Sequence, residues 1–538
     1  MSQPTYHPLD EQLASLMYRL AGTVADTAGL GKLVRHVSAS TREGIIAAPL
    51  VDVPVDMASL LASGVVGEPG EYKPLIVEGS HAWLYRYWLY EQRLAQCIRA
   101  RRVAGETSAE VADLQQLAVE MALRQRFLII SGGPGTGKTT TVTRILAHLL
   151  EQGIRPERIL LAAPTGKAAM RMQESIRDTK QRLALPAEIA ASIPEQASTL
   201  HRLLGYIPNR VAFRHTPENP LPADVVIVDE ASMIDISLMT HLFEAVAPQA
   251  KLILLGDKDQ LASVETGSIF RDLCAGEALA GNKVVLQKSY RFAAEDGIGQ
   301  LAQAIRIADE ERMLEVLTSP AYPEVVLDDG ADGLDAAQLR AGWQAYLQAV
   351  QVGDHAAIFA AFNALRILTP LRKGRLGVET LNVWVDGVMQ KHLPAHGAAS
   401  KPWYVGRPVM VTQNDYRQNL FNGDIGIALP ASNGELRVWF PTGEAGKFRA
   451  IAPIRLPAHE TAWAMTIHKS QGSEFNHVLL VLPELDDLPL LGRELLYTAV
   501  TRAKTGIHVL ASRATLRRAL QQVTPPSSRL QERLQASA

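Results

Sequence analysis

Residues 132–139 constrain the fold of this chain more than any other feature. They are Gly-Gly-Pro-Gly-Thr-Gly-Lys-Thr, which matches G-x-x-x-x-G-K-[ST], and they follow an apolar run at 127–130 and precede a helical pattern at 141–150. A strand, a glycine-rich turn and a helix in this order form a phosphate-binding loop, because glycine lets backbone N–H groups turn toward phosphate and the helix N-terminus attracts anions. The pattern predicts an α/β domain with a parallel sheet.

The residue types in this loop predict individual roles. We expect the Lys138 ammonium to reach the β- and γ-phosphates of ATP, and the Thr139 hydroxyl to bind Mg²⁺. ATP and Mg²⁺ are therefore the predicted cofactors. The residues expected to surround the nucleotide are Gly132, Gly133, Pro134, Gly135, Thr136, Gly137, Lys138, Thr139 and Thr140.

Two adjacent acids, Asp229 and Glu230, end a second apolar run at 225–228. Carboxylates at the end of a buried strand are costly unless they face a cation or water. We expect Asp229 to hold Mg²⁺ and Glu230 to activate the water that attacks the γ-phosphate. Alone, a strand followed by Asp-Glu is equally compatible with a structural role. Downstream of a phosphate-binding loop it predicts ATP hydrolysis.

Short apolar runs alternate with helical stretches in two parts of the chain, which predicts two α/β domains. Continuous β-branched runs are typical of buried parallel strands, and ligands bind where such strands end. We assign residues 109–290 to the first domain, with a small insertion near 205–222, and residues 291–399 and 457–538 to the second. The runs lie at 127–130, 159–162, 225–228 and 252–255, then at 365–368, 478–482 and 507–510.

The segment inside the second domain has a different pattern. Asn433-Gly434 stands between extended runs at 426–429 and 436–440, and Asn422-Gly423 precedes them. Asn-Gly between extended runs is a strong hairpin signal. We predict a small antiparallel β-barrel over residues 400–456.

Residues 1–108 contain no recognisable chemical motif and are predicted to form a mainly helical domain. Their clearest feature is an aromatic stretch at 83–98, with one apolar stripe at helical spacing and further aromatics off that stripe. Such a helix either packs between layers or docks to a partner. We assign it to partner docking.

Two further segments carry loop signals. Residues 319–335, rich in Pro, Asp and Gly, are predicted to form a loop, and the tail around 525–528 (Pro-Pro-Ser-Ser) is predicted to leave the core.

Composition excludes several classes of protein. Of 538 residues, 47% are hydrophobic and 20% charged, which excludes whole-chain disorder. The net charge of −2 allows a local basic groove but no overall basic surface. The two distant cysteines, Cys97 and Cys274, exclude a disulfide scaffold and a zinc cluster and fit a reducing compartment. With neither a signal-peptide pattern nor an apolar run near the ~18 residues of a membrane span, we expect a cytoplasmic protein with no membrane partner.

Five more motifs follow in order, and together with the loop they resemble superfamily 1 helicases over residues 110–513. Residues 131–139, 411–416, 422–424 and the amino-terminal 84–88 with 91–93 resemble the RecD branch. The five motifs are residues 163–167 (Ala-Pro-Thr-Gly-Lys), 229–233 (Asp-Glu-Ala-Ser-Met), 256–261 (Gly-Asp-Lys-Asp-Gln-Leu), 466–475 (Thr-Ile-His-Lys-Ser-Gln-Gly-Ser-Glu-Phe) and 497–503 (Tyr-Thr-Ala-Val-Thr-Arg-Ala).

This resemblance implies that the two α/β domains are RecA-like motor domains and that the inserted barrel is SH3-like. It also implies an ATP-dependent 5′-to-3′ DNA helicase in double-strand break repair and recombination. It implies binding to single-stranded DNA and duplex ends, and a heterotrimer with RecB-like and RecC-like subunits. No compact acidic nuclease cluster is evident, so any DNA cutting belongs to another chain. Stand-alone relatives usually carry helix-hairpin-helix segments at the amino end, and their absence here favours a subunit.

Three other functions remain open: a stand-alone RecD-like helicase, a P-loop ATPase switch, and an assembly module with a dispensable ATPase. The second motif set, 466–475 and 497–503, argues against a switch. Intact Lys138, Glu230 and Arg502 argue against a dispensable ATPase.

The resemblance also implies residue roles around the nucleotide. Gln115 would contact adenine, and Gln260 would sense the γ-phosphate. Arg291 and Arg502 would stabilise charge on the transferred phosphoryl group, which suits the planar, always charged guanidinium. From the second domain, Gly472 and Glu474 would close over the nucleotide.

A DNA-binding track is expected from hydroxyls, cations and backbone donors on both α/β domains. His468 is assigned to DNA or to coupling, because no second His or Cys has metal-ligand spacing with it. Residues 414–416 of the predicted barrel are expected to guide DNA as well. The track residues are Pro164, Thr165, Gly166, Lys167, Thr199 and His201 in the first domain, and Thr466, His468, Lys469 and Ser470 in the second.

Overall fold

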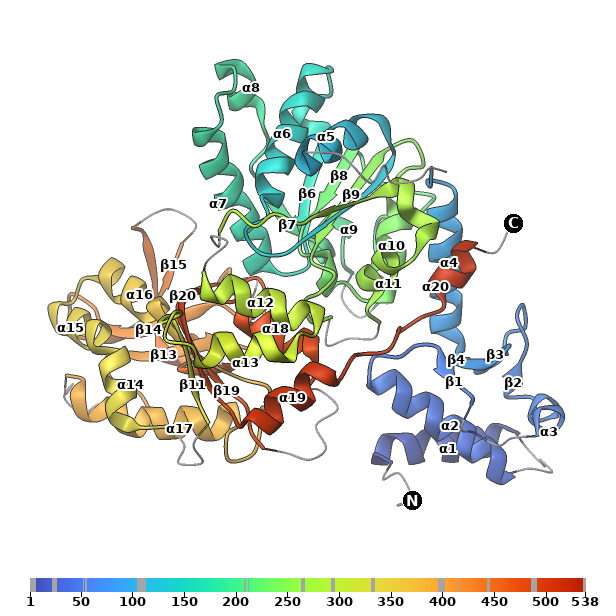
Figure 1. The fold of residues 1–538 in the computed structure, drawn as a ribbon. Coiled ribbons are helices and arrows are strands. Elements are labelled where there is room, and N and C mark those ends of the chain that lie inside the picture. The colour runs from blue at the N-terminus through green and yellow to red at the C-terminus, as the bar shows by residue number, and fades with distance from the viewer. Residues whose placement is uncertain are drawn as a thin grey trace.

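Two α/β domains lie side by side, with an antiparallel sheet next to the second and a smaller amino-terminal domain next to the first (Figure 1). No helix among the residues described is both long and apolar enough to cross a membrane. The computed structural model describes residues 6–21, 27–51, 53, 56–103, 113–207, 210, 212–262, 267–291, 296–329, 334–394, 402–415, 417–442, 446–484 and 491–535.

The first α/β domain is built on a six-stranded sheet in the order β10-β5-β9-β8-β6-β7, in which every neighbouring pair is parallel. All four strands predicted here are confirmed. The strands are β5 (Phe127–Gly132), β6 (Ile159–Ala163), β7 (Ala197–Thr199), β8 (Val225–Val228), β9 (Lys251–Gly256) and β10 (Lys283–Leu286).

Helices cover both faces of this sheet. Alternate residues of β5 point to opposite sides, with Phe127 and Ile129 in one buried cluster and Leu128 and Ile130 in another. The helices are α5 (Leu114–Arg124), α6 (Lys138–Glu151), α7 (Gly166–Arg182), α8 (Ala187–Ser192), α9 (Leu200–Leu204), α10 (Ile236–Ala245) and α11 (Ile269–Ala275), with 3-10 helices η1 (Pro156–Arg158), η2 (Ala231–Met233) and η3 (Glu277–Asn282).

The second α/β domain has a five-stranded parallel sheet in the order β11-β20-β19-β12-β18. The three predicted strands are confirmed as β12 (Leu365–Thr369), β19 (Phe475–Val481) and β20 (Ala503–Leu510). The prediction of a loop over 319–335 is wrong in part, because β11 (Val325–Asp328) pairs with β20 as an edge strand. The fifth strand is β18 (Ala464–Thr466).

Eight α-helices are described in this second domain, and Trp343, Trp463 and Tyr346 lie fully buried among them. The helices are α12 (Gly297–Ile307), α13 (Glu310–Thr318), α14 (Ala336–Gly342), α15 (Gln344–Val352), α16 (His355–Ala364), α17 (Val378–Met389), α18 (Arg493–Val500) and α19 (Arg513–Gln521), with 3-10 helices η4 (Gln390–His392) and η6 (His468–Ser470).

The inserted segment forms a five-stranded antiparallel sheet in the order β16-β15-β14-β13-β17. The predicted hairpin at Asn433-Gly434 is confirmed, and Gly434 has a φ of 79°. The sheet extends to Thr461, beyond the predicted end at 456, and Tyr416 lies outside the described residues. The strands are β13 (Arg407–Val411), β14 (Ile425–Pro430), β15 (Leu436–Pro441), β16 (Phe448–Ile451) and β17 (His459–Thr461), and η5 (Pro453–Arg455) precedes β17.

The amino-terminal region combines helices with a small four-stranded sheet, β1-β4-β3-β2, which the sequence patterns did not reveal. Leu30, Leu33 and Leu60 are fully buried in its own small core. The elements are α1 (Pro8–Ala21), α2 (Thr27–Arg42), α3 (Met57–Ala62), α4 (Tyr85–Arg99), β1 (Ala48–Pro49), β2 (Val66–Gly67), β3 (Leu75–Glu78) and β4 (His81–Leu84).

The aromatic stretch is buried inside this chain, so its assignment to partner docking is wrong. Helix α4 begins at Tyr85, and the fully buried Trp83 belongs to strand β4 instead. Trp88 is 8% exposed, and its Nε1 donates to Glu78 at 2.9 Å. The opposite face of α4 packs on α10, with Leu94 and Ile98 fully buried.

The carboxyl-terminal tail returns to the body of the protein, contrary to the prediction that it leaves the core. It runs from α19 to α20 (Leu530–Gln535), which packs against α4 and α11 (Figure 1). Ser527 is 2% exposed and donates to Asp272 at 2.8 Å, and its carbonyl accepts from the Ile46 N–H at 2.7 Å. Leu530 and Leu534 are fully buried in the first domain's core.

Candidate nucleotide and DNA site

Most of the residues predicted to bind the nucleotide line one cavity of about 640 Å³ between the two α/β domains. The first domain supplies the phosphate-binding loop and both acids, and the second supplies Glu474 and Arg502. Gly132 and Gly133 line a neighbouring cavity, together with Tyr497. The predicted residues in the 640 Å³ cavity are Gln115, Pro134, Gly135, Thr136, Gly137, Lys138, Thr139, Thr140, Asp229, Glu230, Gln260, Arg291, Glu474 and Arg502.

The phosphate-binding loop has the backbone that its glycines predicted. Gly137 has a φ of 82° and directly precedes α6, whose first residue is Lys138. The Lys138 ammonium donates to the carbonyls of Gly132 and Gly133, at 2.5 and 3.1 Å. Gln115 rests on the loop, because its Nε2 donates to the Thr136 carbonyl at 3.1 Å. A Cβ on Gly137 would lie 2.2 Å from that nitrogen, and the positive φ at this position favours glycine independently of that contact.

The two acids stand at the carboxyl end of β8. The Glu230 N–H donates to Asp229 Oδ1 at 2.8 Å, and Glu230 has a φ of 53°, a strained value for a residue other than glycine. Burial and the neighbouring Glu230 raise the pKa of Asp229, while Lys138 opposes this shift. The half-buried Asp229 carboxylate and the Thr139 hydroxyl in one cavity are hard oxygen donors, so these residues fit a Mg²⁺ ion.

Glu474 is the centre of a cluster of cations in the cavity. It pairs with Arg291 at 2.6 Å, with Lys504 at 3.4 Å, and with Arg171 of α7. Burial alone would raise the pKa of Glu474, but Arg171 and Arg291 outweigh it and lower the pKa to about 2. Arg171 was not among the predicted site residues, because no local sequence pattern marks it.

The second predicted arginine is held rigidly. Arg502 is 2% exposed, and its Nε donates to the Thr498 carbonyl at 3.0 Å while Nη1 donates to the Ser473 carbonyl at 3.2 Å. Burial lowers the pKa of Arg502, with partial compensation from Glu230. These contacts orient its guanidinium in the cleft.

Direct hydrogen bonds cross the cleft beside Gln260. The Leu261 N–H donates to the Thr498 hydroxyl at 2.8 Å, and Gln471 Nε2 donates to the Leu261 carbonyl at 2.6 Å. Gln260 Nε2 donates to Asp257 at 3.1 Å, and Tyr497 donates to the same carboxylate at 3.2 Å. This segment of the first domain is therefore bonded to the second.

The DNA residues predicted in the first domain emerge at one edge of its sheet. Strands β6 and β7 are neighbours, with Ala163 paired to Thr199. Thr165 caps α7 by accepting from the Ala168 N–H, and Thr199 caps α9 by accepting from the Arg202 N–H. Pro164 and Gly166 flank Thr165, and the exposed His201 lies in the first turn of α9.

In the second domain, the predicted residues lie at and after the end of β18. Thr466 accepts from the Lys469 N–H at 3.2 Å, and Lys469 pairs with Glu460 at 2.6 Å. His468 is half-buried, and burial lowers its pKa. Ser470 is fully buried and donates to the Ile467 carbonyl at 2.6 Å, so its prediction as a DNA contact is wrong; it stabilises the turn.

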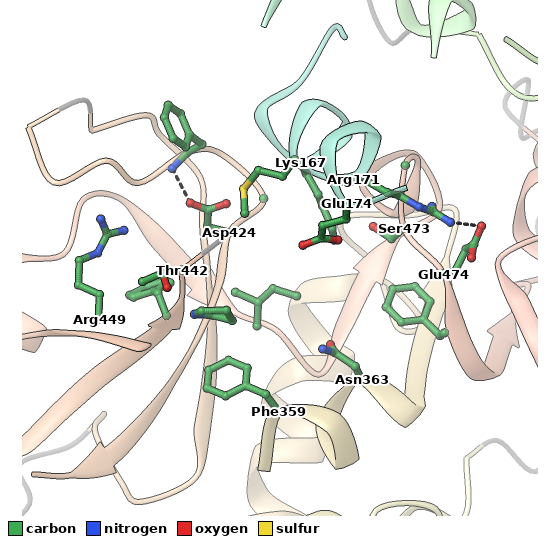
Figure 2. Close-up of a pocket in the computed structure, with 18 of the residues that line it drawn as sticks. Lys167, Arg171, Glu174, Phe359, Asn363, Asp424, Thr442, Arg449, Ser473 and Glu474 are labelled. Carbon is green, nitrogen blue, oxygen red and sulfur yellow. Dashed lines mark hydrogen bonds and ion pairs between the residues drawn. The ribbon is translucent and has the colours of Figure 1, made fainter. Parts of the chain in front are cut away.

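A second cavity of about 460 Å³ lies between α7, α16 and the antiparallel sheet, and Figure 2 shows its side chains. Lys167 lines it, and burial together with Arg366 and Arg171 lowers the pKa of Lys167 to about 8. Gly472, predicted to cover the nucleotide, lines this cavity instead. The ring of Phe421 would lie 3.3 Å from a Cβ on Gly166, so the inserted sheet contacts the start of α7.

Comparison with known proteins finds family matches in both α/β domains that line the nucleotide cavity. Residues 115–266 match the AAA domain family, and residues 461–510 match the UvrD-like helicase C-terminal domain. The chain is 40% identical over 510 residues to the RecBCD enzyme subunit RecD of Mycolicibacterium smegmatis, a match covering 90% of this chain and 87% of that one. The chain belongs to the RecD family.

Two further relatives also match most of this chain. RecD of Haemophilus influenzae is 35% identical over 528 residues, which cover 85% of this chain and 80% of that protein. The ATP-dependent RecD2 DNA helicase of Deinococcus radiodurans is 35% identical over 410 residues, which cover 76% of this chain but 49% of that protein.

Proposed function

We propose that this RecD family member is the 5′-to-3′ motor subunit of a RecBCD-type complex. Membership of the family makes it an ATP-dependent DNA helicase. The subunit role and the direction of travel are the proposal, and the high coverage of the RecD subunits, compared with 49% of RecD2, favours it over a stand-alone helicase.

The observation that carries the proposal is the cavity of about 640 Å³ between the domains. It contains Lys138 and Glu230 from one domain and Arg502 from the other. A nucleotide held there contacts both domains, so its hydrolysis changes their separation. With DNA-contacting residues on each domain, that change moves the domains along a strand.

We assign the chemistry to these side chains. Lys138 and the arginines Arg291 and Arg502 neutralise phosphate charge, and Glu230 takes a proton from the attacking water. A bound Mg²⁺ would be held by Thr139 and Asp229 and would supply further charge neutralisation. Gln115 would contact the base from its place on the loop.

We place single-stranded DNA at the ends of β6, β7 and β18. Thr165, Lys167, Thr199 and His201 would contact it from the first domain, and Thr466, His468 and Lys469 from the second. The contact between Phe421 and Gly166 supports a role for the inserted sheet, which we propose closes as an SH3-like barrel, in guiding the strand.

We propose that RecB-like or RecC-like subunits dock on the amino-terminal domain through the outer face of α1. Leu9, Leu16 and Leu20 are 53%, 40% and 59% exposed and lie at helical spacing, while Ala14 and Met17 face the core. An exposed apolar stripe of this kind is typical of a protein interface.

Two measurements test this function. Strand displacement on duplexes with either a 5′ or a 3′ overhang tests polarity, and we expect activity only with the 5′ overhang and none in Lys138→Ala. Co-purification with the neighbouring subunits tests assembly, which Leu16→Ser with Leu20→Ser should weaken while the ATPase of the isolated chain is retained. Full assembly of that double variant would contradict docking through α1.

A further inference from the structure

Arg171 connects the nucleotide cavity to the second cavity. It lies on α7, one turn after Lys167, and it lines both cavities. Its Nη2 pairs with Glu474 across the domain boundary, and Figure 2 shows the two side chains facing each other. The Arg171 side chain is 32% exposed and that of Glu474 11%, so the pair is only partly screened by water.

Arg171 and Arg291 compete for the same oxygen. Both contact Glu474 Oε1, Arg291 at 2.6 Å, whereas Lys504 lies 3.4 Å from Oε2 and is 46% exposed. Arg291 is also the arginine assigned to the transferred phosphoryl group. To reach a phosphate, Arg291 has to leave a carboxylate that is nearly buried.

The free-energy cost of moving Arg291 away from Glu474 depends on which cations remain beside the carboxylate. With Arg171 present, the carboxylate keeps one close guanidinium after Arg291 moves. Without Arg171, the one cation that remains beside it among the described residues is Lys504, which is 46% exposed and 3.4 Å away. A nearly buried charge that loses its last close partner is costly, so Glu474 would then retain Arg291.

We propose that Arg171 is a positioning residue that holds Glu474 and thereby releases Arg291 to the nucleotide phosphates. The proposal rests on the proposed function, because it assumes that Arg291 acts in ATP hydrolysis. It does not require Arg171 to contact the nucleotide.

A double-mutant cycle of the full-length protein separates this role from others. ATPase kinetics with saturating single-stranded DNA are measured for Arg171→Ala, Glu474→Gln and the double variant. We expect Arg171→Ala to lower kcat at least ten-fold with less than a three-fold change in KM. In the Glu474→Gln background, where no carboxylate retains Arg291, the same substitution should lower kcat less than two-fold.

Controls keep the result interpretable. Arg177→Ala removes another arginine of α7, whose partner Glu195 at 3.2 Å belongs to the same domain, and it should leave kcat within 1.5-fold of wild type. Arg171→Lys keeps the charge and should restore at least a third of kcat. Arg171→Gln repeats the cycle if the alanine variant does not fold.

Three outcomes would overturn the proposal. An equal loss of kcat in both backgrounds would mean that Arg171 acts independently of Glu474. A rise in KM without a fall in kcat would make it a nucleotide contact. Unchanged kcat and KM in Arg171→Ala would mean that Arg171 has no role in ATP hydrolysis. Failure of the role assigned to Arg291 in the proposed function looks different, because Arg291→Ala would then leave the kcat of the otherwise wild-type protein unchanged.

Discussion

A buried ion pair joins helix α20 to the amino-terminal region. Its loss should increase local opening of the carboxyl-terminal residues. Arg533 is 9% exposed, donates to Glu78 at 2.7 and 3.1 Å, and pairs with the fully buried Glu91. Arg533→Met keeps much of the side chain's length and leaves Glu91 without its cation. Removing one partner of a buried pair costs about 3–5 kcal/mol.

The loss of stability in Arg533→Met should depend on pH because Glu91 can take up a proton. Burial raises the pKa of Glu91 although Arg533 opposes the shift, and the variant loses that opposition. A carboxyl whose pKa is higher in the folded than in the unfolded state destabilises the fold as it ionises. The loss of stability is therefore smallest below about pH 4.3, the pKa of a glutamate in the unfolded chain. It grows as the pH rises through the pKa of Glu91 in the folded variant.

Hydrogen exchange measures the effect locally, which suits a protein with several domains. Peptides covering 525–535 should exchange about 10²- to 10⁴-fold faster in Arg533→Met at pH 8, up to the limit set by local opening, since 1.4 kcal/mol is ten-fold. Glu532→Gln, which affects only an exposed pair with Arg529, is the matched control. Adding Glu91→Gln should recover most of the protection.

Two results would refute this reasoning. Unchanged exchange at pH 8 would mean that the pair contributes nothing to holding α20. If Arg533→Met with Glu91→Gln exchanges as fast as Arg533→Met alone, then lost packing causes the effect, and the unpaired Glu91 carboxylate does not.

Three further predictions concern the active cleft and the DNA track. Lys138→Ala should lower DNA-stimulated ATPase at least ten-fold without changing the thermal unfolding midpoint, and retention of more than a tenth of turnover would exclude its assigned role. Glu230→Gln should still bind ATP in equilibrium titrations while hydrolysis stalls, so a collapse of affinity would make it a binding residue. Thr165→Ala with His468→Ala should weaken single-strand affinity and its stimulation of ATPase; unchanged DNA stimulation would exclude this track.

Local sequence patterns predicted the parts of the molecule that are locally determined. The strand, loop and helix around Lys138 are contiguous, and their glycines are needed for the backbone that the loop adopts. The hairpin at Asn433-Gly434 was equally visible, because its turn residues lie between its two strands.

The errors concern segments whose structure depends on distant partners. The edge strand β11 is four residues long, lies among turn-forming residues, and exists because β20 pairs with it. Helix α20 has six residues, and its order comes from Leu530, Leu534 and Arg533 packing against earlier parts of the chain. Arg171 was missed for the same reason, since its partner Glu474 belongs to the other domain.

The course of the carboxyl-terminal tail has a mechanical consequence for the motor. The chain passes from the first α/β domain to the second between β10 and α12, and returns between α19 and α20 (Figure 1). Two rigid bodies joined at one point can rotate about any axis, but bodies joined at two points rotate freely only about the line between them. We therefore expect the returning tail to restrict twisting of the two domains more than opening about that line. Under the proposed function, nucleotide binding and release would then act mainly on this one opening motion.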